Sequence, residues 1–155
     1  MNYLLLNSDE FLEFARPISA KVVHIGGIAL PEPSPLLEEL QKIMDHNYRS
    51  GVVYISFGSI ASTKEMPRKF RRAIFNVARA FAMYTFIWKV DDDDDDVESV
   101  SNLYTFTWRL AHRNLRCFVS HAGLNSVLEL TTSGKPAILV PLFADQFRYK
   151  NPLLF

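Results

Sequence analysis

Apolar and polar residues follow two different patterns along the chain, short β-branched runs and longer amphipathic stretches. A short apolar run bounded by turn-forming residues is typical of a strand that is buried on both faces. Five segments have this pattern and are predicted to be strands: 21–25, 51–56, 85–90, 116–120 and 137–141.

Three amphipathic stretches lie between these runs and are predicted to be helices. Proline, which is favoured in the first helical turn, opens two of them, and a glycine followed by a nearby proline ends the third. The predicted helices span 36–46, 68–84 and 123–133. Strands that alternate with helices indicate βαβ units, so the sequence predicts an α/β fold, a Rossmann-like parallel sheet with helices on both faces.

Four loops that follow predicted strands contain the residues with the most distinctive chemistry. They lie at 24–27, 56–59, 120–126 and 141–146. Ligands of parallel α/β sheets bind beyond the carboxyl ends of the strands. We therefore expect all four loops to converge on one rim and to form a site there.

The second and third loops suit a phosphate group. Small residues at 56–59 let main-chain N–H groups approach an anion, and Ser59 adds a hydroxyl donor. His121 precedes a predicted helix start, whose unpaired N–H groups and positive dipole end suit diphosphate oxygens over 123–126. One turn further along, Glu129 is placed to accept hydrogen bonds from ribose hydroxyls. The alternative interpretation is a helix cap beside a buried structural histidine.

The fourth loop suits a sugar, whereas the first is more typical of a turn. Asp145 and Gln146 follow the last predicted strand, and a carboxylate beside an amide can satisfy both sides of neighbouring hydroxyl groups. An aspartate that only caps the next helix is the alternative. The paired glycines of loop 24–27 favour a simple tight turn over ligand contact.

Charge and composition exclude several classes of partner. Seventeen Lys and Arg balance seventeen Asp and Glu, so no long-range field favours nucleic acid or an anionic membrane. Cys117 is the only cysteine, which excludes an intrachain disulfide and a thiolate zinc site. The six aspartates at 91–96 are predicted to form a solvated loop, because they lack the spacing of a calcium-binding EF-hand. We expect no nucleic-acid partner and no metal.

The two ends of the chain indicate a fragment. No stretch reaches the ~18 apolar residues that span a bilayer, and the start lacks the basic region of a signal peptide. The chain stops on the apolar segment 151–155, without a cap or a polar tail.

An ordered set of motifs resembles a known family. SFGS, then a tryptophan, then FVSHAGLNSVLELTTSGKPAILVPLFADQ resembles the donor-sugar signature of the UDP-glycosyltransferases, in particular the UDP-glucuronosyltransferase-like branch of animals. Upstream, FLEFARPISAKVVHIGGI resembles the linker and first strand of that family's C-terminal domain. The resemblance covers essentially the whole chain.

The resemblance implies the C-terminal half of a two-domain B-type glycosyltransferase fold. Residues 1–20 are then a remnant of the interdomain linker, and 21–155 are the UDP-sugar donor-binding domain, truncated at its C-terminus. The donor is a co-substrate, UDP-glucuronate or UDP-glucose, and no cofactor is implied. The N-terminal half would bind a small lipophilic acceptor and carry the catalytic base, so no catalytic residue is expected in this chain. The family location is the endoplasmic reticulum membrane.

The resemblance also assigns roles by position. Ser59 and His121 match diphosphate ligands, with further contacts from the helix start at Gly123, Asn125 and Ser126; Glu129 matches the ribose ligand, Asp145 and Gln146 the sugar ligands, and Trp108 the residue that stacks on uracil. The uracil platform departs from the family pattern, which has proline and glutamine after the tryptophan. Only thirteen positions separate Trp108 from His121. The loss of about five residues removes more than one helical turn of ~3.6 residues.

Two functions follow from these observations as alternatives. The first is the donor domain of an inverting UDP-glycosyltransferase. The second is an inactive truncated module that binds UDP-sugar weakly, associates with itself or pairs with a full-length relative. A nucleotide-binding oxidoreductase or an NTPase lacks support, because neither GxGxxG nor a Walker loop is present.

Overall fold

The core of the protein is a parallel sheet of five strands in the order β5-β4-β3-β6-β7. The computed structural model describes residues 2–28, 30, 36, 38–45, 49–91, 99–106 and 114–149. The strands span Val52–Ser56 (β3), Thr85–Lys89 (β4), Leu103–Phe106 (β5), Leu115–Ser120 (β6) and Ala137–Leu139 (β7). The predicted α/β class with a parallel sheet is confirmed.

Alternate residues of the central strands face opposite layers. On β3, Val52 and Tyr54 belong to one buried cluster, whereas Ile55 belongs to the other. On β4, Ile87 faces the first layer and Trp88 the second, and neither side chain is exposed at all. When both faces of a strand are buried, successive side chains must all be mainly apolar, which explains the continuous apolar run.

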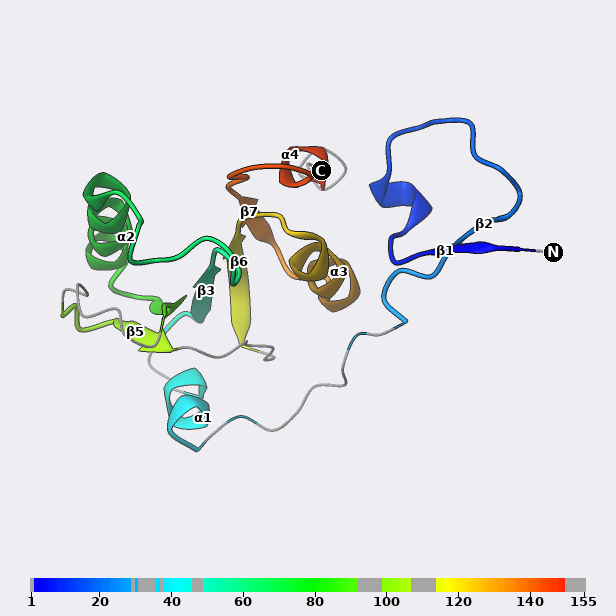
Figure 1. Cartoon of the computed structure of the whole chain (residues 1–155). Coiled ribbons are helices and arrows are strands. Elements are labelled where there is room, and N and C mark those ends of the chain that lie inside the picture. Colours follow the sequence, from blue (N-terminus) through cyan, green and yellow to red (C-terminus); the bar gives the residue numbers. More distant parts are fainter. Residues whose placement is uncertain are drawn as a thin grey trace.

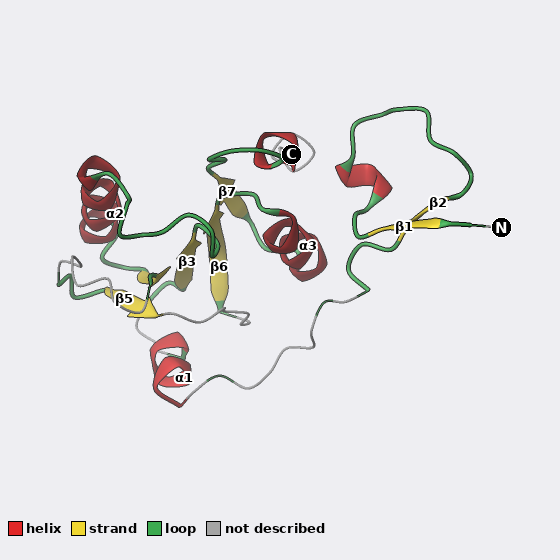
Figure 2. Ribbon diagram, viewed as in Figure 1, coloured by secondary structure: helices red, strands yellow, loops and turns green. Residues whose placement is uncertain are grey.

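Helices cover both faces of the sheet (Figure 1, Figure 2). The helices α1 (Glu38–Met44) and α3 (Leu124–Ser133) pack on one face, and α2 (Arg68–Ala80) packs on the other. The predicted end of α3 is confirmed, because Gly134 has a left-handed backbone with φ of 60° and donates its N–H to Leu130.

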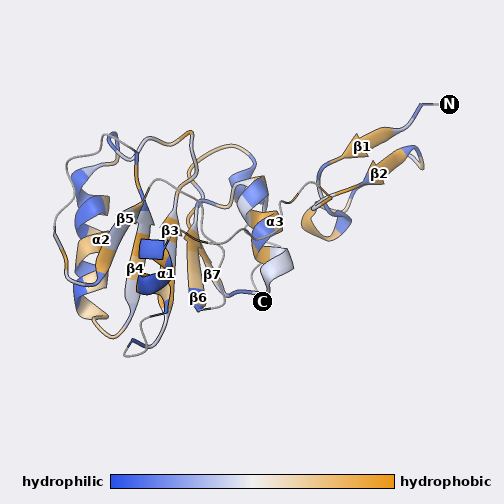
Figure 3. Ribbon diagram, turned by 90° about the horizontal axis from the view of Figure 1, so that it is seen from below, coloured by the Kyte–Doolittle hydropathy of each residue, from blue (hydrophilic) through white to orange (hydrophobic). Residues whose placement is uncertain are grey.

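The face that carries α2 is only partly covered. Beside α2 it leaves apolar side chains of β7 and of the residue that follows it in solvent, with Ile138 56% and Val140 39% exposed. Phe70 and Val77 of α2 lie next to these side chains and are about half exposed. Together the four residues line an apolar trough beside α2. In Figure 3 apolar colour runs along the strands, and α2 shows both polar and apolar residues. No described helix is long and apolar enough to cross a membrane.

The N-terminal segment forms a separate parallel pair, β1 (Leu4–Leu6) with β2 (Val22–His24). Figure 1 shows this pair apart from the five-stranded sheet. The strand predicted at 21–25 is therefore correct, but its loop at 24–27 does not share the rim of the main sheet, so the predicted convergence of four loops was wrong for that loop. The main-chain N–H groups of Ile25 and Gly26 instead bond to Leu6 and Ser8. The domain boundary at residue 20 stays a prediction.

Four elements of the described part of the chain were not predicted from the sequence. They are β1, the 3-10 helix η1 (Glu10–Leu12), the edge strand β5 and the one-turn helix α4 (Gln146–Tyr149). The proline that opens the first predicted helix lies outside the described residues. Most of the aspartate run lies outside them too, because only Asp91 of that run is described.

Candidate ligand site at the carboxyl ends of the strands

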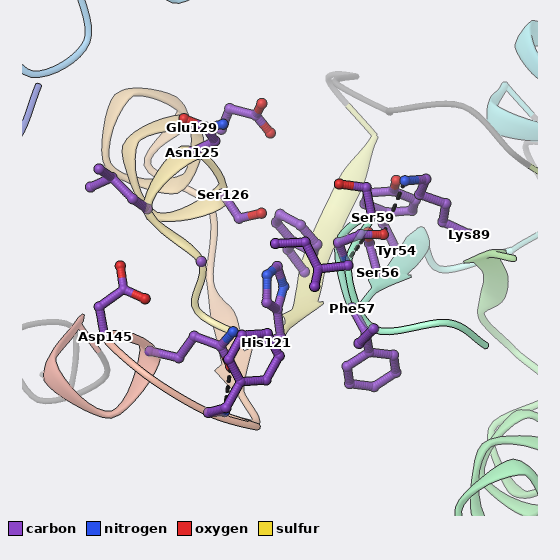
Figure 4. Close-up of a pocket in the computed structure, with 18 residues that line it drawn as sticks. Tyr54, Ser56, Phe57, Ser59, Lys89, His121, Asn125, Ser126, Glu129 and Asp145 are labelled. Carbon is purple, nitrogen blue, oxygen red and sulfur yellow. Dashed lines mark hydrogen bonds between the residues drawn. The ribbon is translucent and has the colours of Figure 1, made fainter. Parts of the chain in front are cut away.

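A cavity of about 380 Å³ opens beyond the carboxyl ends of β3 and β6 (Figure 4). The strand order reverses here, because β3 leads to β4 and β5 on one side, whereas β6 leads to β7 on the other. Such a switch point is where open parallel sheets bind ligands. All predicted site residues within the described part of the chain line this cavity: Ser59, His121, Gly123, Asn125, Ser126, Glu129, Asp145 and Gln146. The expected meeting of these residues is confirmed, and their roles in binding stay predictions.

The loop after β3 is held in a tight turn at the floor of the cavity. Gly58 has a φ of 86°, a conformation that favours glycine. Its N–H donates to the Ser56 hydroxyl at 3.4 Å, and its carbonyl accepts from the Lys89 ammonium group at 3.1 Å. These bonds fix the start of the loop that carries Ser59.

The imidazole of His121 lies between two glycines from different loops. A Cβ atom on Gly58 would lie 2.7 Å from Cε1 of the ring, and one on Gly123 would lie 2.4 Å from Nε2. Both distances are far below van der Waals contact. Only glycine therefore leaves room for the ring in its present position, which Figure 4 shows beside the cavity.

Burial lowers the pKa of His121, because desolvation disfavours the charged ring. The Ser56 carbonyl and the Asp145 carboxylate oppose this effect, and Lys89 adds to it. The Nδ1 atom is buried and makes no hydrogen bond of ordinary geometry with the described residues. His121 is therefore mostly neutral at pH 7 and can present one N–H donor.

The start of α3 supplies further donors. Its N-cap is Gly123, which has no side chain to bond to the first N–H groups of the helix. Ala122, directly before Gly123, is fully buried and has a φ of 64°. Its main-chain N–H donates to the Ser120 hydroxyl at 3.2 Å. Ser126 and Glu129 follow on one face of the helix, three residues apart, and both line the cavity.

The chain after β7 brings Asp145 and Gln146 to the cavity, and Figure 4 shows Asp145 across from Ser59. Gln146 is only 3% exposed, and its Oε1 accepts the N–H groups of Leu142 at 2.7 Å and Phe143 at 3.0 Å. Its carbonyl oxygen therefore shapes the loop, and its amide nitrogen is the part left for a ligand. Asp145 is exposed and can accept hydrogen bonds from a ligand.

Lys89 was missed by the sequence reasoning, although it is the only lysine or arginine among the described residues that line the cavity. Its signal was available, because it ends β4, the neighbour of β3 in the sheet. Among the predicted residues, Trp108 lies outside the described part of the chain, so its uracil contact stays a prediction. No group of three metal-ligating side chains occurs among the described residues.

A parallel α/β domain with donors and carboxylates at its switch point belongs to the broad class of nucleotide-binding folds. Comparison of the chain with family sequence models identifies the particular family. The chain belongs to the family described as UDP-glucoronosyl and UDP-glucosyl transferase, whose model matches residues 1–151.

Individual relatives agree with this assignment. The Caenorhabditis elegans protein ugt-48, which is named as a UDP-glucuronosyltransferase, is 37% identical over 94% of this chain and 29% of its own length. UDP-glucosyltransferase 2 of Dactylopius coccus is 33% identical over 94% of this chain and 28% of its own length. The chain thus spans less than a third of these relatives.

Solved structures share the fold. The kitacinnamycin glycotransferase has a TM-score of 0.73 at 16% identity, over 99% of this chain and 40% of its own. Arabidopsis thaliana UGT89C1, solved in complex with UDP, has a TM-score of 0.63 at 23% identity, over 84% of this chain and 35% of its own.

Proposed function

We propose that this domain binds a UDP-sugar donor for hexosyl transfer to a small lipophilic acceptor. The observation that carries the proposal is the single cavity in which Ser59, His121, the start of α3, Glu129 and Asp145 meet. Membership of the UDP-glycosyltransferase family and the UDP found in a structural neighbour support it.

The diphosphate would lie over the start of α3. The N–H groups after Gly123 carry no side-chain cap, and the helix dipole adds positive potential at that end. Ser59 and neutral His121 add donors, and Lys89 supplies a full positive charge. The described residues thus offer a diphosphate both hydrogen bonds and positive charge.

The two carboxylates suit the hydroxyl-rich parts of the donor. Glu129 lies on α3 beyond the phosphate end, which places it for the vicinal hydroxyls of the ribose. Asp145 approaches from the loop after β7 and suits the transferred sugar. A carboxylate accepts two hydroxyl donors, which makes each group selective for a diol.

The same groups would assist departure of UDP. In the inverting reaction, the acceptor oxygen bonds to the anomeric carbon while the bond from that carbon to the diphosphate oxygen breaks. The electron pair of this bond passes to UDP, and the acceptor proton passes to a base. The helix start, His121 and Lys89 offset the new charge on UDP. The family's base lies in its other half, so we assign none to this chain.

Calorimetric titration of the purified chain with UDP, UDP-glucose and UDP-glucuronate tests the proposal. We expect saturable binding of UDP and of at least one UDP-sugar. His121→Ala should weaken both ligands about 5- to 150-fold, the equivalent of one lost hydrogen bond of roughly 1–3 kcal/mol. Asp145→Asn should weaken only the UDP-sugar. Glu39→Gln, an exposed change on α1, is the control. If the chain binds neither UDP nor a UDP-sugar, the proposal is wrong.

Association of this domain with a second copy is the other candidate function. The apolar trough beside α2 favours it, because Ile138 and Val77 are 56% and 45% exposed. Sedimentation velocity should show a concentration-dependent dimer that Ile138→Asp removes. A monomer at every concentration would contradict this candidate.

A further inference from the structure

The segment between β1 and β2 packs against α4, the helix that follows the loop after β7. A short 3-10 helix, η1 (Glu10–Leu12), starts at Asp9, whose carboxylate accepts the Phe11 N–H at 2.9 Å. It buries Leu12 to 4% exposure in a cluster with Val127 and Leu128 of α3 and Tyr149 of α4. An apolar anchor thus joins the N-terminal segment to both helices of the candidate site.

Charged contacts reinforce this anchor. The Glu13 carboxylate, only 9% exposed, lies 3.1 Å from the Arg148 guanidinium group of α4. The same guanidinium group lies over the ring of Phe14, 5.6 Å from its centroid. Arg148 is therefore held by a carboxylate and an aromatic face from one stretch of three residues, with Leu12 beside it.

The helix α4 needs such support because it has a single turn. An isolated turn is unstable, since few main-chain hydrogen bonds offset the cost of ordering it. Its first residue, Gln146, holds the N–H groups of Leu142 and Phe143, and Asp145 directly precedes it. Any shift of α4 therefore moves the loop that faces the cavity.

We propose that residues 12–14 form a clamp on α4 and that Leu12 and Glu13 are positioning residues for Asp145 and Gln146. The clamp acts mainly on the sugar end of the donor, because Arg148 lies on α4, whereas the loop before α3 is also held by the bond from the Ala122 N–H to the Ser120 hydroxyl. This inference rests on the proposed function. Residues 12–14 would then contribute to donor selectivity, although they are not among the residues that line the cavity.

Two variants of equal chemistry test the clamp. Glu13→Gln removes the charge that faces Arg148, whereas Glu10→Gln makes the same change at an exposed position of η1. We expect Glu13→Gln to weaken UDP-glucose about 5- to 20-fold and to leave UDP within twofold, since only the sugar contacts are displaced. Glu13→Asp, which keeps the charge that faces Arg148, should retain more of the binding than Glu13→Gln. A general loss of stability would weaken both ligands alike.

Amide hydrogen exchange gives a readout without ligand. The N–H groups of Arg148 and Tyr149 both donate to the Asp145 carbonyl, and they should exchange faster in Glu13→Gln but not in Glu10→Gln. Unchanged exchange, or equal weakening of UDP and UDP-glucose, overturns the clamp. If the unsubstituted chain binds no UDP-sugar, the proposed function and the donor role of the clamp fall together, and exchange still decides whether the clamp holds α4.

Discussion

Replacing Gly123 by alanine should displace His121 without straining the backbone. The φ of Gly123 is −67°, which alanine adopts freely, so the added methyl group is the whole perturbation at that position. At Gly58 the same change would also meet a φ of 86°. Gly123→Ala therefore isolates the steric part of the glycine cradle around the imidazole.

The distances set the size of the effect. The new Cβ would lie 2.4 Å from Nε2 of His121, so the ring must retreat by about 1 Å to reach an ordinary contact of 3.4 Å. A donor moved by this distance loses its hydrogen bond, at a cost of roughly 1–3 kcal/mol, or about 5- to 150-fold in affinity.

Calorimetry with UDP measures this loss against a matched glycine. Gly134, at the other end of α3, has nothing within 4 Å of an added Cβ. Its left-handed φ should make Gly134→Ala destabilise the fold by about 1 kcal/mol, but UDP affinity should stay unchanged. The decisive experiment repeats Gly123→Ala in a His121→Ala background, where it should cost little more. An equal cost in both backgrounds would show that the methyl group collides with the ligand rather than with His121, and the cradle argument would fail.

Three further predictions concern the same site. Glu129→Gln should weaken UDP about 5- to 150-fold in calorimetry relative to Glu39→Gln, because ribose hydroxyls lose a charged acceptor; equal affinities would refute the ribose role. Because the pKa of His121 is lowered in the folded chain, the unfolded chain binds a proton at a higher pH than the folded chain does. The urea midpoint of unfolding should therefore fall as the pH drops from 8 through ~6.5, and His121→Gln should make the midpoint less dependent on pH. The purified chain alone should show no transferase turnover, since a positioned base typically contributes 10²–10⁴-fold; saturable formation of a glucoside or glucuronide would contradict it.

The sheet and its main helices were predictable because their patterns are self-contained. The run at 51–56 is apolar on both faces, and a strand with no polar side belongs in the middle of a parallel sheet. The helix α3 has its own stop signal in Gly134. The loops that carry Ser59, His121 and Asp145 then followed from topology, since parallel strands end at one rim.

The missed elements depend on partners that are distant in sequence. The pattern at 21–25 predicts a strand, but nothing in it says that the strand pairs with Leu4–Leu6 rather than with the main sheet. The helix α4 has only four residues, too few to show a period, and its position depends on Leu12 and Glu13 from the other end of the chain. Contacts of this kind leave no local signal.

Backbone strain at the site was equally hidden from the sequence. Ala122 and Ala144 are the two described residues other than glycine with positive φ, at 64° and 54°. Each adjoins a predicted ligand, His121 or Asp145, and a left-handed alanine costs roughly 1–2 kcal/mol. Such strain persists only where the surrounding fold fixes the backbone, as Ser120 does for buried Ala122 through its hydroxyl. Both strained residues lie in loops that line one cavity, so this cost in stability is concentrated beside His121 and Asp145, the residues that we propose contact the donor.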